Sequence, residues 1–542
     1  MHISSPARAK RLNVIQVLAV VLVAAAVVSA SGTARSTDGT TIVYRVNADW
    51  SSYDYQTLRG TAASAQMIMP VTDRLVAFGP GQKIVPYVAS RWVVTPTSVT
   101  FFIRQDKKMT CADGTPLTPE VIGRSFARQV DGTKHSISTL AAQYGPGPYS
   151  VHWNMKKWTF TFTVGTPYSP LLLAFAHPQE SIYCPKGYAN EVDNKSNWYG
   201  SGPYTVVSAV HGDAVVYQKR PEWNWGPPGT DPKKMPDTLI IKIITDETTA
   251  ANALITGAVD FSQISGTDQA RLDTTQGLTR SEYERTVASM WVIPNMAAGK
   301  FGDNPAIRLA LYTALDPKVV NQLANNGRGT VLGGPFLAPG ADCYDPKMNK
   351  LLTYPNQGSV TAALNILTTH GFTFQNGKLS GSDGKQIGFT ITTPTTTGSM
   401  PEYLAAQWSQ LGFNVSINQV PTTTFASLFQ SGNFDVSVGT VAIRANDPSG
   451  WISFMTGKPV PDGTNVGSSG YRDTFAQAQV VTAMGALGDT RCMAWDNVFK
   501  RYHGWAYAFP LNAVWDVYYS DSKVSFVPFA NTQIEPAFIQ VK

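Results

Sequence analysis

The sequence predicts an α/β fold, and three observations support this prediction. Two segments, residues 238–261 and 387–417, each show a strand, a helix and a second strand in direct succession. Units of this kind build a parallel or mixed sheet flanked by helices. Of the 542 residues, 43% are hydrophobic and 15% are charged, which allows a large core and argues against disorder. The chain has no repeat of solenoid period and no low-complexity linker long enough to separate independent domains, so we expect intimately connected lobes.

The first half of the chain contains short segments with the pattern of strands. Residues 41–46 and 158–164 alternate between apolar and other side chains, which is typical of strands with one buried face. Residues 62–78 carry apolar side chains at helical spacing, with an interruption at Pro70. Further strand-like runs are separated by Pro and Ser, at residues 85–88, 91–94 and 99–103.

The first strand–helix–strand unit has recognisable ends. Residues 238–244 are strand-like, and Asp246 or Thr248 can cap the helix that follows. Gly257 ends this helix, and residues 259–261 resume an extended pattern. In the second unit, a helix starting at Pro401 and closed by Gly412 lies between two alternating strands, residues 387–392 and 413–417.

The N-terminus has the pattern of a secretory signal, which we expect to span residues 1–34. Arg8, Lys10 and Arg11 precede an apolar stretch, and small residues follow it, so cleavage after Ala30 or Ala34 fits. The alternative is an uncleaved anchor, because the apolar stretch is long for a signal. No cysteine follows, so we expect no lipid anchor. The prediction is an exported protein in the periplasmic space or at the outer face of the cell membrane or cell wall.

Export gives the four cysteines a meaning. They are widely spaced and form no CxxC pair, which argues against a redox or zinc motif. In an oxidising compartment an even number favours disulfides, with three possible connectivities. We favour Cys111–Cys184 and Cys343–Cys492, because this pairing keeps each bridge within one half of the chain. The alternative is four buried free thiols.

Several function classes find no support. The net charge of +6 is spread along the chain without a long basic run, which argues against a nucleic-acid partner. Hydrolase motifs such as Gly-x-Ser-x-Gly and HExxH are absent, as is a phosphate-binding loop, so we expect no enzyme and no cofactor. The seven histidines are scattered, with His503 the most arguable exception, so a direct metal site is not expected.

A series of short motifs resembles one family of transport proteins over essentially the whole chain after the signal. Asp-Gly-Thr-Pro-Leu-Thr stands at residues 113–118, Gly-Ser-Gly-Pro-Tyr at 200–204 and Leu-Ile-Thr-Gly-Ala-Val-Asp at 254–260. Residues 72–92 and 307–316 carry further matches. Each motif alone is ordinary turn chemistry, but their order and spacing are similar to the extracytoplasmic solute-binding proteins of family 5, which serve peptide, dipeptide, oligopeptide and nickel ABC importers.

The resemblance implies a two-lobed, periplasmic-binding-protein-like fold of type II, cluster C, with an extra small domain in the first lobe. The first lobe is expected from residues 41–85, 196–292 and 506–542, the small domain from 86–195 and the second lobe from 293–505. Crossings near Ile293 and Tyr507 would act as a hinge, with ligand between the lobes. The implied protein is a monomer that captures peptides and delivers them to ABC permease and ATPase subunits.

Two segments are the best candidates for ligand contact, residues 49–55 and 442–451. A closing cleft needs aromatic walls and a few placed polar groups. Tyr53, Tyr55 and Trp451 supply flat contact surface, although ordinary packing within a lobe is the alternative for each. The polar candidates of the second segment are Arg444, Asn446 and Asp447.

Arg444 departs from the family pattern. Peptide-binding members usually carry Ala-Asp-Tyr-Pro-Asp-Pro here, and their first Asp holds the α-ammonium group of the ligand. Alignment of Asp447-Pro448 with the final Asp-Pro places Arg444 at or next to that acidic position. A guanidinium repels an ammonium group and attracts a carboxylate or phosphate, so we expect no conventional anchor for a free peptide N-terminus. A loop shift that lets Asp447 serve as the anchor is the alternative.

Two other functions remain open. Trp223, Trp225 and Trp451 are able to stack on sugars, so the ligand is alternatively a non-peptide solute such as an oligosaccharide, siderophore or metal chelate. A sensor that reports ligand occupancy to a membrane partner is the third reading, and the residues do not separate it from transport.

Overall fold

A computed structural model of the chain describes residues 39–50, 53–54, 56, 62–132, 137–189, 198–440, 447–452, 456–463, 465–529 and 533–542. Contacts within the chain define two units, Met1–Thr40 and Thr41–Lys542, and the sheets of the described residues lie in the second. In the described part of the chain, no helix combines the length and the apolar character needed to cross a membrane.

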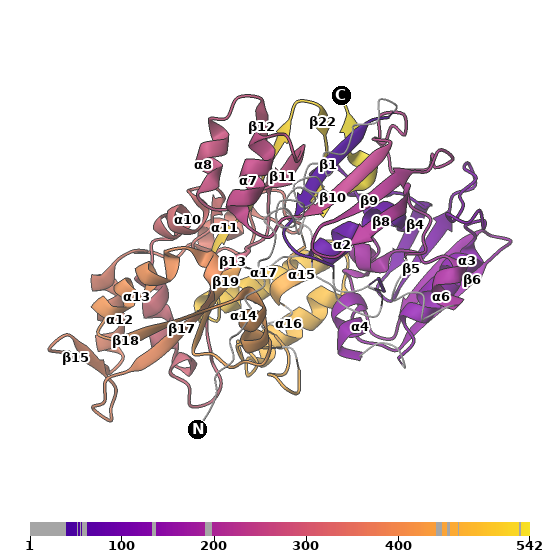
Figure 1. The fold of residues 1–542 in the computed structure, drawn as a ribbon. Coiled ribbons are helices and arrows are strands. Elements are labelled where there is room, and N and C mark those ends of the chain that lie inside the picture. The colour runs from indigo at the N-terminus through magenta and orange to yellow at the C-terminus, as the bar shows by residue number, and fades with distance from the viewer. Residues whose placement is uncertain are drawn as a thin grey trace, which may run out of the picture. The chain divides into compact units, whose positions relative to one another are not determined.

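A mixed seven-stranded sheet forms the first lobe. β1 runs parallel to its neighbours β10 and β11, whereas the remaining pairs are antiparallel. β1, β10, β9 and β8 are visible side by side (Figure 1). The strands in spatial order are β12 (Leu278–Glu284), β21 (Trp515–Asp521), β11 (Phe261–Gln263), β1 (Thr41–Val46), β10 (Thr238–Ile243), β9 (Ala214–Lys219) and β8 (Tyr204–Val210).

The predicted strand–helix–strand unit of this lobe is confirmed. Helix α7 (Glu247–Ile255) connects β10 to β11, and the Asp246 carboxylate caps it by accepting from the amide of Thr249 at 2.7 Å. Gly257 follows the helix with a φ of +71°, a conformation that glycine adopts without steric cost. The other helices of this lobe are α2 (Ala62–Ile68) and α8 (Asp268–Asp273).

A small domain is built on a four-stranded antiparallel sheet in the order β4 (Ala89–Thr95), β5 (Ser98–Ile103), β7 (Thr159–Val164) and β6 (Tyr149–Asn154). Helix α3 (Pro119–Gln129) lies against it so closely at Gly123 that an added Cβ would stand 2.2 Å from Trp153. Its apolar core is continuous with that of the seven-stranded sheet, which makes the small domain part of the first lobe. Three short helices complete it: α4 (Ile137–Tyr144), α5 (Leu171–Ala174) and α6 (Pro185–Ala189).

A six-stranded sheet forms the second lobe, and its β17, β18 and β19 are parallel. The second predicted unit is confirmed as β17, α13 and β18. The strands are β14 (Thr330–Val331), β20 (Phe509–Ala513), β13 (Met290–Pro294), β19 (Val436–Thr440), β17 (Gly388–Pro394) and β18 (Asn414–Val420). The helices are α9 (Pro305–Thr313), α10 (Pro317–Asn325), α11 (Pro346–Leu352), α12 (Val360–Thr369), α13 (Met400–Gln410), α14 (Thr422–Gln430), α15 (Ser449–Ile452), α16 (Thr474–Gly485) and α17 (Gly488–Gly504).

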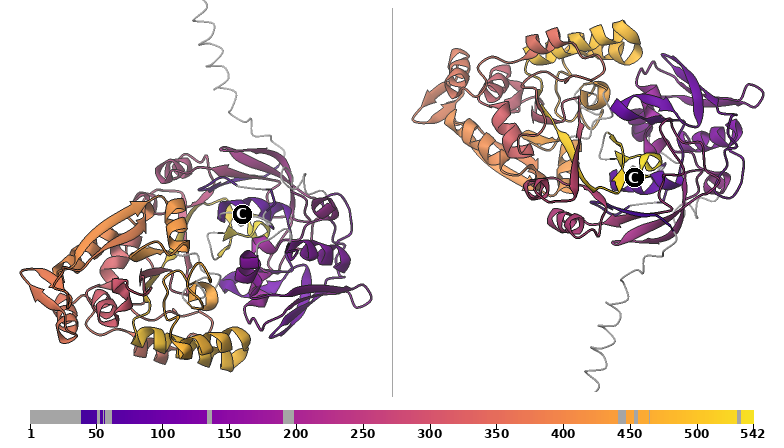
Figure 2. Two further views of the ribbon diagram at one scale, coloured as in Figure 1. Left: turned by 90° about the horizontal axis from the view of Figure 1, so that it is seen from below. Right: turned by 90° about the horizontal axis from the view of Figure 1, so that it is seen from above.

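Helices α16 and α17 pack along each other and appear as neighbouring golden helices (Figure 2). Four two-stranded ribbons complete the described chain: β2 (Val76–Phe78) with β3 (Ile84–Pro86), β15 (Thr373–Gln375) with β16 (Lys378–Ser380), β22 (Val524–Ser525) with β25 (Gln540–Val541), and β23 (Pro528–Phe529) with β24 (Gln533–Ile534).

The chain passes between the two large sheets twice, after β12 and after β20. The two passages touch, because the amide of Val514 donates to the Ser289 hydroxyl at 2.9 Å. Ile293 and Tyr507, the crossing positions expected from the resemblance, lie within β13 and just before β20. The expected crossings thus lie a few residues away from the observed passages. Both passages continue directly into apolar strands, so the hydrophobic pattern of the sequence does not change where the chain leaves one sheet for the other.

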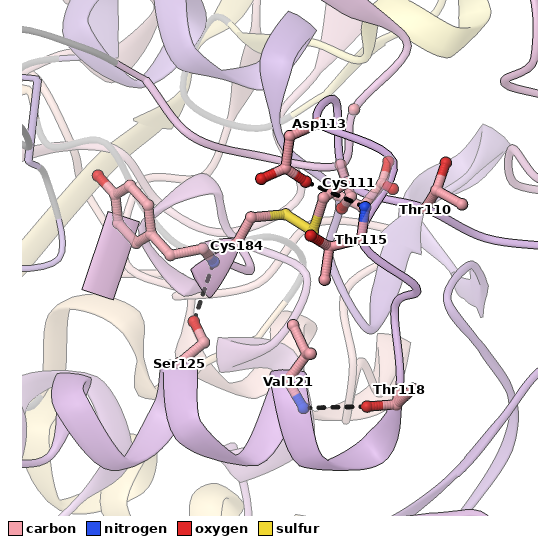
Figure 3. Close-up of a disulfide and its surroundings, with 12 residues drawn as sticks. Thr110, Cys111, Asp113, Thr115, Thr118, Val121, Ser125 and Cys184 are labelled. Atoms are coloured by element: carbon pink, nitrogen blue, oxygen red, sulfur yellow. Dashed lines mark hydrogen bonds between the residues drawn. A yellow bond between two sulfur atoms is a disulfide. The ribbon is translucent and has the colours of Figure 1, made fainter. Parts of the chain in front are cut away.

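Both predicted disulfides are present, Cys111–Cys184 and Cys343–Cys492. The first joins the turn before α3 to the start of α6 (Figure 3). Around it, Asp113 accepts from the amide of Thr115 at 3.0 Å, and the Ser125 hydroxyl accepts from the amide of Tyr183 at 2.9 Å. The bridge and the hydrogen bond between Ser125 and Tyr183 hold two distant segments of the small domain together, whereas the Asp113 contact is local to its turn.

Candidate ligand-binding site

The two segments that we selected from the sequence follow the carboxyl ends of parallel strands. Residues 49–55 come directly after β1, and residues 442–451 come after β19. In open α/β sheets, ligands bind in the crevice outside the carboxyl ends of the strands. The carboxyl ends of β1 and β19, which these segments follow in the sequence, are therefore the sheet edges where a ligand is expected.

Three of the six predicted ligand contacts lie outside the described residues: Tyr55, Arg444 and Asn446. For Trp451 the structure describes a place in helix α15 and not the side chain. The roles of these four residues therefore remain predictions. Tyr53 and Asp447 are fully described, and their surroundings differ strongly.

Tyr53 belongs to an aromatic cluster at the end of β1. Its ring lies 4.5 Å from that of Trp198 and 6.0 Å from that of Trp50, measured between centroids. Trp50 in turn stacks on His211 at 3.9 Å, and the His211 ring nitrogen Nδ1 lies 3.1 Å from the Asp49 carboxylate. Trp50 is buried, whereas Tyr53 is half-buried and keeps part of its ring accessible. Burial raises the pKa of Tyr53, so its hydroxyl is neutral at physiological pH.

The segment that carries Tyr53 is fixed to the small domain by Arg128 of α3. The Arg128 guanidinium pairs with the buried Asp54 carboxylate and donates to Gln56 Oε1 at 2.9 Å. Gln56 donates onward to the Ser125 hydroxyl at 3.3 Å, and the Tyr183 hydroxyl donates to the carbonyl of Tyr53 at 2.9 Å. These contacts tie Tyr53, Asp54 and Gln56 to α3 and to Tyr183, so the position of Tyr53 depends on the small domain.

Asp447 is buried and both of its carboxylate oxygens are occupied. Oδ1 accepts from the amide of Ser449 at 2.9 Å, at the start of α15, and Oδ2 accepts from Arg491 at 2.5 Å. Arg491 is itself buried and also pairs with Asp342. The negative charge of Asp447 is therefore balanced within the protein.

A cavity of about 30 Å³ lies at the carboxyl ends of β1 and β11. Its charged group, Arg45, is satisfied by Glu247 at 2.8 Å and by the carbonyls of Ile244 and Gln263. The hydroxyl of Tyr518 is buried and has no hydrogen-bond partner in the described part of the chain. The cavity has room for one or two water molecules or a small uncharged group. Its described lining comprises Tyr44, Arg45, Val46, Asn47, Ala63, Gln66, Phe261, Gln263, Tyr518 and Ile534.

Metal-ligand chemistry is sparse in the described residues. The one group there of three His, Cys, Asp or Glu ligand atoms is Asp342 with Cys343 and Cys492, and these two sulfurs are joined in a disulfide. His503, which the sequence left as the arguable exception, stacks on Tyr354 at 4.0 Å between ring centroids. Burial lowers the pKa of His503.

The chain matches the family described as bacterial extracellular solute-binding proteins, family 5 (middle), over residues 83–460. It belongs to this family. The match spans the small domain, the first passage between the large sheets, the parallel strands of the second lobe and Asp447, so the resemblance inferred from the motifs is confirmed.

Two curated relatives are named as peptide-binding proteins. The probable peptide-binding protein YejA of Agrobacterium fabrum is 24% identical over 398 residues, which cover 64% of this chain and 63% of that protein. The periplasmic oligopeptide-binding protein OppA of Salmonella typhimurium is 23% identical over 398 residues, covering 68% of this chain and 69% of OppA. This chain thus spans somewhat less than two thirds of the length of YejA.

A solved structure of another substrate-binding protein shows the same fold. It is a substrate-binding protein from Microbacterium hydrocarbonoxydans in complex with 4-hydroxybenzoate hydrazide, at 20% identity and a TM-score of 0.74. The match covers 93% of this chain and all of that one. The predicted two-lobed fold with a small domain is confirmed.

Arg128, Trp198 and Arg491 were missed in the sequence. Each lies far along the chain from the residue that it contacts, and no spacing within the sequence connects Arg128 to Asp54 or Arg491 to Asp447. One sequence signal for the second pair was available. Arg491 stands at helical spacing from Ala494, Trp495 and Val498 on the apolar face of α17, a pattern that predicts a buried arginine in need of a partner.

Proposed function

We propose that this protein is the substrate-binding component of an ABC importer, exported to the outer side of the cytoplasmic membrane, where it captures peptides and delivers them to a permease. The observation that carries this proposal is the family match over residues 83–460, together with two curated relatives that are both named as peptide-binding. Tyr53 and its aromatic neighbours supply one wall, and backbone groups of an extended peptide supply hydrogen bonds that tolerate different sequences.

The charges around Asp447 favour an unusual mode of peptide binding. Because Arg491 and the amide of Ser449 occupy its carboxylate, Asp447 has no free oxygen directed to a ligand ammonium group among its described contacts. Turning the carboxylate toward a ligand ammonium group would weaken its buried ion pair with Arg491, which is unfavourable. With Arg444 aligned at or next to the usual acidic position, we infer that binding does not depend on a free peptide N-terminus.

An affinity comparison between peptides tests this inference. Calorimetric titration with a mixed tripeptide library and with its N-acetylated counterpart is expected to give dissociation constants within about threefold of each other, or less than about 0.7 kcal/mol. Replacement of Arg444 by Asp, the family's usual residue, is expected to restore a preference for the free ammonium group. A loss of binding on acetylation in the unaltered protein would contradict the proposal and make Asp447 the anchor.

A non-peptide solute is the second candidate. The Microbacterium protein, with the same fold, was solved with a small aromatic hydrazide, so the fold itself does not specify a peptide. A protein that binds neither peptide library but retains a small molecule from its host would favour this candidate.

A further inference from the structure

The loop between β7 and α5, residues 165–170 of the small domain, contacts the second lobe. The Ser169 hydroxyl donates to the carbonyl of Ala483 at 3.0 Å, and the Ser169 amide donates to the carbonyl of Met484. These two carbonyls lie in the last turn of α16, where the helix itself supplies no amide donor for them. At Gly485 the approach is so close that an added Cβ would lie 3.1 Å from Pro167.

Arg491 connects this contact to the candidate site. Its Nε donates to the Ser169 hydroxyl at 3.0 Å, while another nitrogen of the same guanidinium donates to the Asp447 carboxylate at 2.5 Å. A third interaction pairs it with Asp342, next to the disulfide cysteine Cys343. The planar guanidinium offers its donors in a fixed geometry, so a shift of one partner displaces the others.

We propose that Arg491 is a positioning residue that couples contact between the small domain and the second lobe to the placement of residues 447–452. The Ser169 hydroxyl orients the Arg491 guanidinium, which in turn holds the Asp447 carboxylate. Asp447 accepts from the amide of Ser449 at the start of helix α15, which carries Trp451. Loss of the Ser169 contact leaves Arg491 with its two carboxylates only and loosens α15. The role of this coupling in ligand capture rests on the proposed function, whereas the coupling itself is a property of the ligand-free protein.

The test uses the full mature protein without ligand and measures two quantities. The first is the distance distribution between spin labels at Met155 and Val481, which are 43% and 71% exposed and lie in the small domain and in α16. The second is the rate of amide hydrogen exchange in residues 447–452. Replacing Ser169 by Ala is expected to raise the population of longer distances and the exchange rate together, each about fivefold. The Gly485→Val variant, which forces Pro167 away without touching Arg491, is expected to do the same.

Ser150→Ala is the matched control, because Ser150 is an exposed serine of the same domain. It is expected to leave both quantities unchanged. Longer distances in the Ser169→Ala and Gly485→Val variants without faster exchange in residues 447–452 would overturn the coupling, and so would unchanged distances. Neither result depends on which ligand is bound, so the peptide assignment stands or fails separately.

Discussion

Replacing Arg128 by Met is expected to lower the free energy of unfolding by about 3–5 kcal/mol. The substitution keeps most of the side-chain volume but leaves the buried Asp54 carboxylate without its cation and Gln56 without a donor. It also releases the segment that carries Tyr53, so we expect weaker ligand binding along with the loss of stability. Urea denaturation followed by far-UV circular dichroism measures the change.

Arg124 is the matched control for this experiment, because it lies on the same helix, one turn away. It pairs with Glu120 at 2.9 Å, but the two side chains are 56% and 44% exposed. An exposed pair of this kind contributes little, so Arg124→Met is expected to cost less than about 0.5 kcal/mol. Removing both buried charges, with Asp54→Leu added to Arg128→Met, is expected to recover part of the loss. Equal effects at positions 124 and 128 would contradict this account of the anchor.

Loss of the Cys343–Cys492 disulfide is expected to lower the free energy of unfolding by about 2–5 kcal/mol. The bridge joins residues 149 positions apart, compared with 73 for Cys111–Cys184, and a longer closed loop restricts the unfolded chain more. Asp342 and Arg491 are the sequence neighbours of the two cysteines, so the Cys343→Ser, Cys492→Ser double variant also removes the covalent link that fixes their ion pair. Because Arg491 holds Asp447, residues 447–452 are expected to become more mobile.

Thermal unfolding of the double variant, with and without a reducing agent, tests this prediction. The Cys111→Ser, Cys184→Ser variant serves as the comparison, since its bridge lies within the small domain and away from Arg491. Both variants are expected to unfold at lower temperature, and only the loss of Cys343–Cys492 is expected to accelerate exchange in residues 447–452. An unchanged melting temperature after removal of Cys343–Cys492 would contradict the assigned role.

Local patterns in the sequence sufficed for the elements whose cause is local. The alternating strand of residues 159–164 and the capped helix that begins after Asp246 are present because periodicity and capping act within a few residues. The passages between the sheets could not be located in this way, since Ser289 and Val514 are joined by tertiary pairing alone. The same holds for the candidate site. Tyr53 was selected by residue type alone, whereas the contacts of Trp198 with Tyr53, of Arg128 with Asp54 and of Arg491 with Asp447 form only on folding.

We propose above all that this protein captures peptides, and identification of the ligand that it carries in its host tests this proposal most directly. We would purify the mature protein from its own host, record native mass spectra, and identify the small molecules released on denaturation. We expect a ladder of masses that sequence as short peptides, bound at one per protein chain. A sugar, siderophore or metal chelate at the same stoichiometry would contradict the peptide assignment, although the two-lobed family 5 fold would remain.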